Sequence, residues 1–558
     1  MKLFEKEIHL IIILILFSAS LFSIGLGRMA LTDPDESFYA ETGREMLERG
    51  EWLTPYIFGK PQFEKPPFYY WLVMLGFKAF GINEFASRIG SAVFGIIGVI
   101  GIYLLGKLLV SRKTGFFSGI VLATSLMYII LSRACVTDMV LSVFILYAFL
   151  FFFYGYLKEY GKTKWYLLSA ASLGLAVLTK GPVGVFLPVV IIGIYLIFTK
   201  ELKKIKEIPF LRGTLIFLAV CLPWYVLMYR VHGKDFIDVF FGFHNMTRFL
   251  HPEHALGDTF YYYGPILIAT FFPWILILPL GIWQARRETD EKIKKTNLFL
   301  LIWFLVIFVF FSLSRTKLPT YIFPIYPALA LLVGRFLEVF SNGKLTRAQG
   351  KGMTISLCVF LASPIIGMTV LYFVLKRKYP TIMEASLIAG IIFILLMSVS
   401  VIALLKKKYR TGLIAYMTSF VIFVALLSYF ILPEIGRYES SKEVSGKLLE
   451  FAGANEKIAA ETKYVRGVAF HTGRENVPDI HPHHLMTGFL NSKDRVWCVL
   501  KEKNLNQLYD DKKRSFTTPT YVVYKLGKKV LVTNKVPPSG KFLKMRGKNE
   551  SQNQKNHN

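Results

Sequence analysis

The residues of this chain best suited to chemistry are the charged side chains between Leu31 and Lys65. Five acids lie between Leu31 and Leu47, in a protein of formal net charge +29: Asp33, Asp35, Glu36, Glu41 and Glu45. The second half contains Glu64-Lys65-Pro66-Pro67, whose prolines stiffen the backbone that presents Glu64 and Lys65. A carboxylate such as Asp35 can accept a proton or stabilise developing positive charge, and a cation such as Lys65 suits a phosphate. We therefore predict a reaction site here.

Further polar residues stand at the ends of apolar segments later in the chain. They are Arg133, Asp138, Lys180, His244, Asn245, Arg248, His251, His254, Arg315, Lys317 and Tyr321. A charge at a membrane boundary costs free energy unless it is paired, hydrated or used. If these residues share one membrane face with the stretch from 31 to 65, they predict a polar cavity at the membrane surface. Arg248 and Lys317 would suit a phosphate there, as Lys65 does.

Each of these residues also has a structural explanation. Asp35 and Glu36 can stabilise the N-terminus of a following helix, and Asp138 can do the same for the apolar segment after it. Arg133 and Lys317 can be anchors whose charged ends reach the membrane interface. The histidines between residues 244 and 254 lack the spacing of metal ligands on a helix. The convergence of several such groups, more than any one residue, indicates a site.

The composition is that of a polytopic membrane protein. Of 558 residues, 54% are hydrophobic, and the mean hydropathy of +0.46 lies outside the range of soluble globular proteins. A span needs about 20 mostly apolar residues, and about 13 such segments are present. They lie near residues 8–27, 90–110, 115–134, 138–157, 165–179, 182–199, 212–231, 260–283, 297–314, 318–340, 353–375, 383–405 and 412–433. Most basic residues fall in short loops between them, which argues against nucleic-acid binding.

Basic clusters follow every even-numbered segment, as at residues 107–113 and 406–410. Because Lys and Arg are enriched in loops on the inner face, the N-terminus is predicted inside and the long loop 29–89 outside. The first apolar segment is long enough to span and lacks a good cleavage site, so we expect a retained helix and no signal peptide. We predict a membrane domain over 1–433, with the site on loop 29–89.

Beyond residue 433 the composition becomes charged and polar, and an odd number of spans places this segment outside as well. Here we expect a small α/β domain over 434–545 and a disordered tail over 546–558. The elements predicted within the domain are an amphipathic helix at 441–451 and strands at 495–500, 521–524 and 529–533, the last two joined by a hairpin at Leu526-Gly527.

An ordered series of motifs resembles the membrane glycosyltransferases of the protein O-mannosyltransferase group, which have the GT-C fold. The resemblance is closest to the ArnT-like branch, which transfers 4-amino-4-deoxy-L-arabinose from undecaprenyl phosphate to lipid A. The series covers about the first 340 residues, and its order, more than any single piece, is specific. Its pieces are Asp33-Pro34-Asp35-Glu36, Tyr39-Ala40-Glu41, Phe63-Glu64-Lys65-Pro66-Pro67, Trp71, Phe80-Gly81, Arg88, Thr137-Asp138, Thr179-Lys180-Gly181-Pro182, Asn245, Arg248-Phe249, His254, Tyr262-Tyr263, Pro273-Trp274, Lys317, Tyr321 and Pro324.

The resemblance implies a polytopic α-helical GT-C fold and an inverting transfer from a polyprenyl-phosphate sugar, with the lipid phosphate as leaving group. Carried over by motif, Asp35 and Asp138 are the acids of the site, and Glu36 is a further catalytic candidate beside Asp35. The residues expected to hold the donor phosphate are Lys65, Arg248, Tyr321 and Lys317. Glu64 and His254 resemble positions that hold zinc, so we expect a structural zinc or other divalent metal there. No other cofactor is expected.

We therefore predict transfer of aminoarabinose or a similar sugar to lipid A at the periplasmic face of the inner membrane. The predicted partners of this monomer are the polyprenyl-phosphate donor, a glycolipid acceptor and the bilayer, but no nucleic acid. Transfer of galacturonic acid or mannose to lipid A core or to a protein stays open. A lipid-linked sugar flippase or transporter is the alternative of another class, although we find no internal repeat of the kind that transporters often have. A structural membrane protein with an outer binding domain is a third reading.

Overall fold

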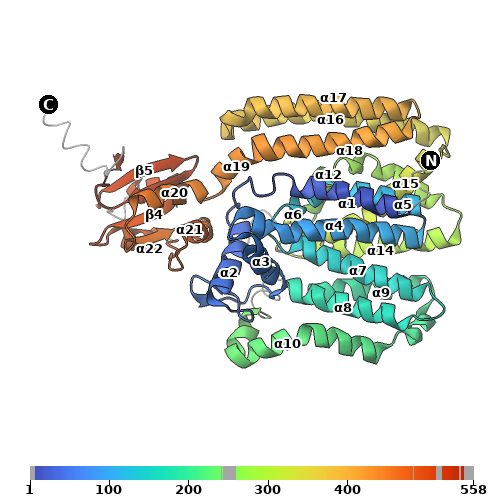
Figure 1. Ribbon diagram of the computed structural model, residues 1–558, viewed down its shortest axis with the longest axis horizontal. Helices are drawn as coiled ribbons and strands as arrows, with labels where there is room; N and C mark the ends of the chain where they lie inside the picture. The colour runs from blue at the N-terminus through green and yellow to red at the C-terminus, as the bar shows by residue number, and fades with distance from the viewer. Residues whose placement is uncertain are drawn as a thin grey trace.

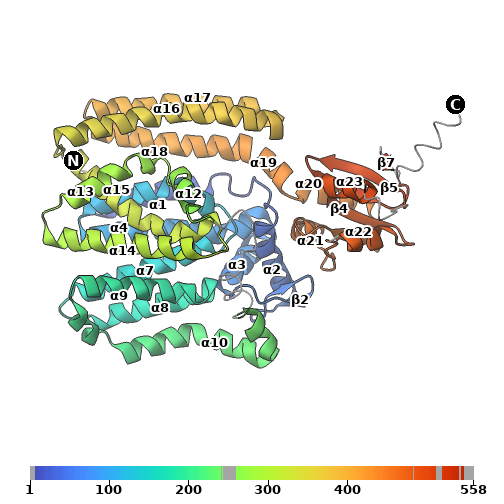
Figure 2. The ribbon, with the colours of Figure 1, turned by 180° about the vertical axis from the view of Figure 1, so that it is seen from behind.

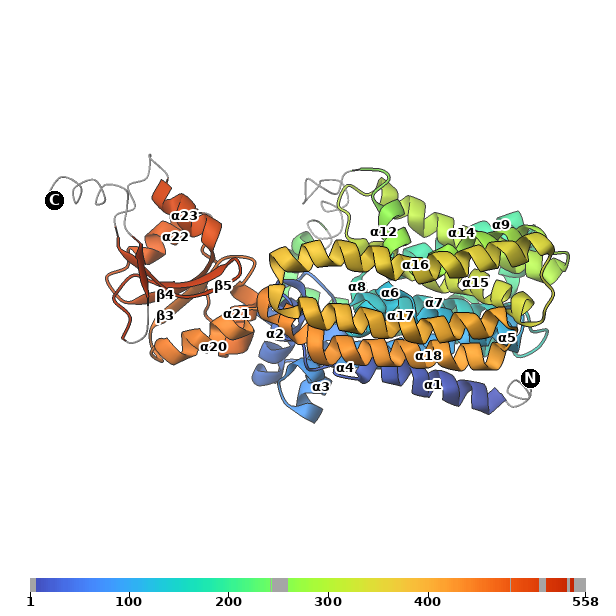
Figure 3. The ribbon, with the colours of Figure 1, turned by 90° about the horizontal axis from the view of Figure 1, so that it is seen from above.

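The computed structural model describes residues 7–240, 242, 259–481, 483–510, 518–538 and 542–545. Helices lying side by side form a bundle, and a smaller α/β domain lies at one end of it (Figure 1). Helix α1 (Glu7–Ser23) begins at the end of the bundle farthest from this domain (Figure 3). The predicted tail over 546–558 lies outside the described residues.

All of the predicted apolar segments coincide with helical structure. Among the described residues, seven helices are long and apolar enough to cross a membrane, or eight if one bent pair counts as a span. This is fewer than the prediction of about 13 spans, because several segments form shorter or broken helices. After α1 the bundle helices are α4 (Glu84–Leu109), α5 (Arg112–Ala123), α6 (Leu126–Ser132), α7 (Asp138–Tyr156), α8 (Thr163–Lys180), α9 (Val183–Phe198), α10 (Phe210–Ile237), α12 (Tyr263–Thr270), α13 (Leu278–Arg286), α14 (Glu291–Leu313), α15 (Tyr326–Ser341), α16 (Arg347–Lys378), α17 (Met383–Leu405) and α18 (Tyr409–Leu426).

Two of the predicted spans are broken, and the breaks lie against each other. The third span bends by 69° between α5 and α6, and the eighth consists of α12, a short 3-10 turn and α13. The amide of Leu126, at the first break, donates to the carbonyl of Phe272 at 3.2 Å, and the Trp274 indole donates to Thr124 Oγ1 at 3.0 Å. Backbone polar groups in a bilayer need partners inside the protein, and here one break provides them for the other.

The connection between the fifth and sixth spans is a tight pair of helices. Helix α8 ends at Lys180, Gly181 has a φ of +87°, and α9 begins at Val183. That backbone conformation favours glycine. Gly184 packs on the backbone of Ala176, where an added Cβ would lie 2.6 Å from the carbonyl carbon. The immediate reversal leaves Lys180 at the tip of the pair.

The loop between α1 and α4 is a folded unit that lies between the bundle and the α/β domain (Figures 1 and 2). It contains α2 (Asp35–Arg49), a hairpin of β1 (Tyr56–Ile57) and β2 (Lys60–Pro61), and α3 (Phe68–Phe80). Buried aromatic residues join α2 to α3, and the rings of Tyr39 and Tyr69 meet edge to face with centroids 5.4 Å apart. This packing gives the loop a rigid core of its own.

The α/β domain has a five-stranded mixed sheet in the order β3-β4-β6-β5-β7. Strands β3 and β4 are parallel, and the other described pairs are antiparallel. The predicted helix, the three predicted strands and the hairpin at Gly527 are confirmed. The elements are α20 (Lys442–Phe451), β3 (Lys457–Ala460), α21 (Val465–Thr472), α22 (His483–Leu490), β4 (Val496–Lys501), α23 (Glu502–Asp510), β5 (Thr520–Leu526), β6 (Lys529–Thr533) and β7 (Leu543–Met545).

The α/β domain is fixed to the loop between α1 and α4 at Asp33, whose buried carboxylate joins both. It accepts hydrogen bonds from Ser37 Oγ at 2.8 Å and from Ser441 Oγ at 2.6 Å. The Asp33 amide donates to the carbonyl of Glu439 at 3.1 Å, and Gly467 of α21 packs directly on the carboxylate. Two further ion pairs cross the same joint, Arg49–Glu475 at 2.7 Å and Lys442–Glu84 at 2.5 Å.

Gly467→Ala should loosen this joint. A Cβ at residue 467 would overlap a carboxylate oxygen of Asp33 and lie 2.8 Å from its carboxyl carbon. We expect a loss of about 1–3 kcal/mol in the free energy of unfolding, seen as a lower thermal midpoint of the full-length protein in detergent. Gly446→Ala in α20 is the control, because nothing lies within 4 Å of its new Cβ. Equal midpoints for the two variants would contradict the role of Gly467.

Candidate functional site

Helix α2 begins with the two acids predicted for the site. Asp35 and Glu36 occupy its first turn, where the positive end of the helix dipole stabilises carboxylates. Successive side chains leave a helix about 100° apart, so the two carboxylates point in different directions. Glu36 is buried and Asp35 is exposed. Only one of these neighbouring acids is therefore accessible to a substrate.

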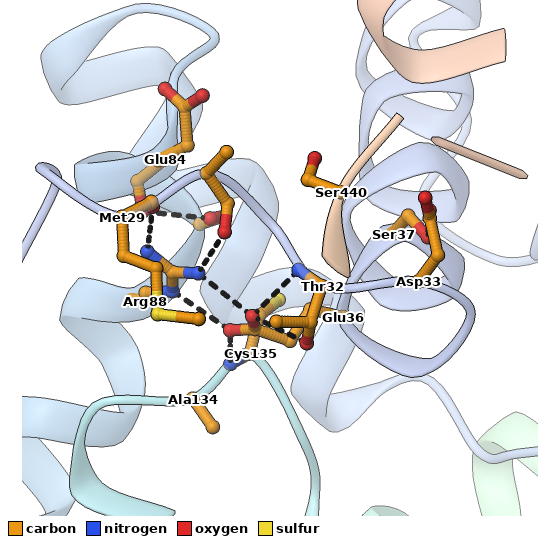
Figure 4. A network of polar contacts seen from close by, with 12 residues as sticks. Met29, Thr32, Asp33, Glu36, Ser37, Glu84, Arg88, Ala134, Cys135 and Ser440 are labelled. Atoms are coloured by element: carbon orange, nitrogen blue, oxygen red, sulfur yellow. Dashed lines mark hydrogen bonds and ion pairs between the residues drawn. The ribbon is translucent and has the colours of Figure 1, made fainter. Parts of the chain in front are cut away.

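Glu36 points into the protein, where both of its oxygens are bound (Figure 4). It accepts two hydrogen bonds of 2.7 Å from the Arg88 guanidinium and one of 2.9 Å from the Cys135 amide. The amide and hydroxyl of Thr32 donate at 3.0 and 2.9 Å. Burial alone would raise the pKa of Glu36, but the charge and hydrogen bonds of Arg88 hold it below the ordinary value. These contacts do not support the prediction that Glu36 is catalytic and give it a structural role.

Asp35 faces charged residues from separate parts of the chain. Partial burial of its carboxyl is the largest effect and raises its pKa. The charge of Arg466 in α21 opposes this shift, whereas the nearby carboxylates of Asp138, Glu36 and Glu64 add to it. A carboxyl whose pKa is raised in this way can accept a proton or stabilise positive charge. Asp35 therefore lies within electrostatic range of Asp138 and Glu64.

Asp138 begins α7 and is paired with Lys180 at the tip of the α8–α9 pair. Lys180 Nζ lies 2.7 Å from Asp138 Oδ1, and the two side chains are 15% and 12% exposed. The same ammonium lies 5.2 Å from the ring centroid of Tyr321, within cation–π range. Tyr321 belongs to the 3-10 helix Pro319–Ile325, and buried Lys317 lies just before it. Acids, cations and an aromatic ring therefore meet at one end of the bundle.

Lys65 is held in a stiff turn before α3. Its Nζ donates to the carbonyl of Glu64 at 3.2 Å, and the side chain is half-buried. The Glu64 amide donates to Gln62 Oε1 at 2.9 Å, and Gln62 donates to the Tyr70 hydroxyl at 2.8 Å. Pro67 occupies the N-cap position of α3. These hydrogen bonds and the two prolines restrain the turn.

Arg248 and His254 lie outside the described residues, so their predicted roles stay predictions. Within the described parts of the chain, no three His, Cys, Asp or Glu residues form a group able to hold a metal. Glu64 Oε1 lies 4.0 Å from the guanidinium of Arg466 and thus faces a cation. A zinc shared by Glu64 and His254 stays a prediction, and we derive no step through it.

Two arginines near the site were not identified as site residues from the sequence. Arg88 stands in the motif series, but nothing local shows that it neutralises Glu36. Arg466 lies in the C-terminal domain, where no motif marks it. Its position depends on how that domain docks, and no signal in the sequence would have found it.

Parts of this chain are similar in sequence to known proteins. The family described as Dolichyl-phosphate-mannose-protein mannosyltransferase matches residues 64–227. Undecaprenyl phosphate-alpha-4-amino-4-deoxy-L-arabinose arabinosyl transferases of Photorhabdus laumondii and Erwinia tasmaniensis are 30% and 33% identical, over 61% and 57% of this chain. An uncharacterised protein of Aquifex aeolicus is 34% identical over 60% of this chain and 74% of its own length. This chain belongs to the ArnT-like family of membrane glycosyltransferases.

Solved structures share the fold of this chain. ArnT from Cupriavidus metallidurans, bound to undecaprenyl phosphate, has a TM-score of 0.79 at 22% identity and covers 94% of this chain and 98% of its own. The oligosaccharyltransferase AglB from Archaeoglobus fulgidus has a TM-score of 0.53 at 12% identity and covers 97% of this chain and 74% of its own. The predicted GT-C fold is confirmed, in a multi-pass inner-membrane protein. The chain spans 61% and 57% of the length of the two arabinosyl transferases.

Arg88→Ala should be far more damaging than loss of a surface arginine. It leaves Glu36 buried without its counter-ion, and breaking a buried pair in this way costs about 3–5 kcal/mol. The control Arg49→Ala breaks an ion pair of the same 2.7 Å length. Because the side chains of Arg49 and Glu475 are 33% and 44% exposed, its loss should lower the free energy of unfolding by less than about 1 kcal/mol. Thermal unfolding in detergent compares the two. Similar losses would contradict the structural role of the buried pair.

Asp33 should make stability depend on pH. Burial raises its pKa from 3.8 to about 6, although hydrogen bonds from Ser441 and Ser37 and the charges of Lys529 and Lys463 lower it. The folded state therefore binds a proton that the unfolded state releases, and this contribution to stability is lost as pH rises from 3.8 through about 6.

Asp33→Asn removes the titrating group and keeps a polar side chain in the same place. The thermal midpoint of the wild-type protein, measured relative to that of this variant, should fall across the same pH range. A difference between the two midpoints that stays constant with pH would contradict this assignment.

Proposed function

We propose that this protein transfers 4-amino-4-deoxy-L-arabinose, or a similar sugar, from undecaprenyl phosphate to lipid A, acting as a monomer at the outer face of the inner membrane. The observation that carries this proposal is the meeting of accessible Asp35 with the Asp138–Lys180 pair, beside the stiff turn of Lys65. The named arabinosyl transferases and the ArnT bound to undecaprenyl phosphate support the choice of donor.

The donor phosphate binds among the cations at this end of the bundle. As the bond from the sugar to the phosphate breaks, its electron pair and negative charge pass to the phosphate oxygen. Preorganised cations stabilise that charge without further reorganisation. Lys65 meets this need because its turn is fixed, and Lys317 and Tyr321 lie on the segment beside Lys180. Arg248 is assigned to the same phosphate.

Asp35 acts on the sugar side of the reaction. An oxygen of the acceptor forms a bond to the anomeric carbon while the bond to the donor phosphate breaks, which inverts the configuration. A lipid A phosphate is already an anion and needs no base, so Asp35 orients the donor sugar and stabilises its developing positive charge. If the acceptor is a hydroxyl, Asp35 takes its proton. Asp138, held by Lys180, is the second acid facing the sugar.

The acids of the site also favour one kind of sugar over another. The amino group of an aminosugar is attracted to the carboxylates of Asp35 and Glu64, whereas galacturonic acid would be repelled by them. This favours an amino sugar over the acidic alternative. The outer orientation is supported by the basic clusters, which follow the even-numbered spans, whereas the site lies on the loop after the first span.

Mass spectrometry of lipid A tests this function. Cells with the intact gene should carry one added sugar per modified phosphate, and cells without the gene should carry none. Asp35→Asn and Lys65→Ala should match the deletion, with transfer reduced at least about 100-fold because each removes a charge that acts in the transition state. The controls Asp494→Asn and Lys60→Ala change exposed residues and should retain the modification.

Membrane levels of every variant are compared on immunoblots, so that loss of protein is not taken for loss of transfer. Lipid A that is identical with and without the gene would refute the proposed acceptor. Full modification in both site variants would refute the assigned residues.

A further inference from the structure

Arg466 projects from the C-terminal domain toward the acids of the outer loop. The residues around it in α21 are fixed, because Gly467 packs on Asp33 and the ring of Phe470 lies 6.2 Å from that of Phe77 in α3. The Arg466 guanidinium lies 4.7 Å from the ring centroid of Phe38, one turn after Asp35 in α2. The docking of the domain thus places a cation beside Asp35.

The Arg466 guanidinium contributes little to holding the C-terminal domain in place. Within the described residues, its one ion pair is with Glu64 at 4.0 Å, and its side chain is 28% exposed. The ion pairs that join the same two parts of the protein are much shorter, at 2.5 Å for Lys442–Glu84 and 2.7 Å for Arg49–Glu475. A docking contact would be expected to resemble them. Arg466 instead keeps hydrogen-bond donors available next to Asp35.

The ring of Phe38 sets the orientation of that cation. An arginine placed over an aromatic face gains cation–π energy and still has N–H groups at its edge for an anion. Those groups match a phosphate, which arginine binds through two parallel hydrogen bonds. An anionic acceptor that approaches Asp35 and Glu64 would otherwise be repelled, so it needs a cation at this point of its path.

We infer that Arg466 binds the phosphate of the acceptor, and that the acceptor headgroup therefore lies between the outer loop and the C-terminal domain. This inference rests on the proposed function, since it assigns the second of the two phosphates in that reaction. Lys65, Lys317 and Tyr321 serve the donor phosphate from the loop and the bundle. Arg466 serves the acceptor phosphate from the C-terminal domain, so that the two phosphates are bound by different parts of the protein.

Binding and kinetics of the full-length protein in nanodiscs test this inference. The probes are bisphosphorylated lipid A and the same lipid A after removal of its phosphates, with binding measured by native mass spectrometry. Arg466→Ala should weaken binding of the phosphorylated lipid about 10- to 100-fold and leave the dephosphorylated lipid unaffected, as expected for loss of charged hydrogen bonds. Arg466→Lys should restore only part of this affinity, because an ammonium lacks the planar fork.

The kinetic arm separates acceptor from donor. Arg466→Ala should raise the KM for lipid A by a similar factor and leave the KM for the donor unchanged. The control Lys442→Ala breaks another ion pair of the same joint and should change neither. The inference would be overturned if Arg466→Ala weakened binding of both lipid probes equally, or if it raised the KM for the donor.

A different result would show that Arg466 acts on Asp35 and does not bind the acceptor. If Arg466→Ala shifts the acid limb of the pH–rate profile to higher pH and leaves the acceptor KM unchanged, Arg466 acts through Asp35, whose pKa the charges of Asp138, Glu36 and Glu64 also influence. That outcome overturns acceptor binding. Wild-type protein that binds lipid A in an Arg466-dependent manner but transfers no sugar would support this inference and refute the proposed function. Wild-type protein that does not bind lipid A refutes both.

Discussion

The buried ion pair between Arg88 and Glu36 is the contact on which the geometry of the site depends. Its side chains are 2% and 7% exposed, and charges so buried are tolerated only with further hydrogen bonds. Arg88 finds them at the carbonyls that follow α1, and Glu36 at the backbone between α6 and α7 (Figure 4). One pair therefore joins the end of α1, the start of α2, helix α4 and the α6–α7 turn.

The positions of both candidate catalytic acids follow from that contact. Asp35 is the neighbour of Glu36 in the first turn of α2, so burial of Glu36 turns Asp35 outward. Asp138 comes three residues after Cys135, whose amide donates to Glu36 at 2.9 Å. The same carboxylate thus anchors the segments that present Asp35 and Asp138.

Charge is distributed over three parts of the molecule that meet at this place. The bundle provides the Asp138–Lys180 pair, the loop between α1 and α4 provides Asp35 and Lys65, and the C-terminal domain provides Arg466. The C-terminal domain is fixed by the buried carboxylate of Asp33, and looser docking would move the cation away from the acids.

The sequence by itself was enough to predict the apolar segments, the folded C-terminal domain and a candidate site on the loop between α1 and α4. These properties are local, because hydropathy, prolines and acids at a helix start act within a few residues of themselves. Asp35 and Glu36 look alike at that level, and only the approach of Arg88, 52 residues away, decides which of them is buried. The partner of Asp138 lies 42 residues away at Lys180. Arg466 reaches the site through a joint between Asp33 and Ser441, which are 408 residues apart. Such contacts depend on how whole elements pack, and no local pattern in the chain specifies that packing.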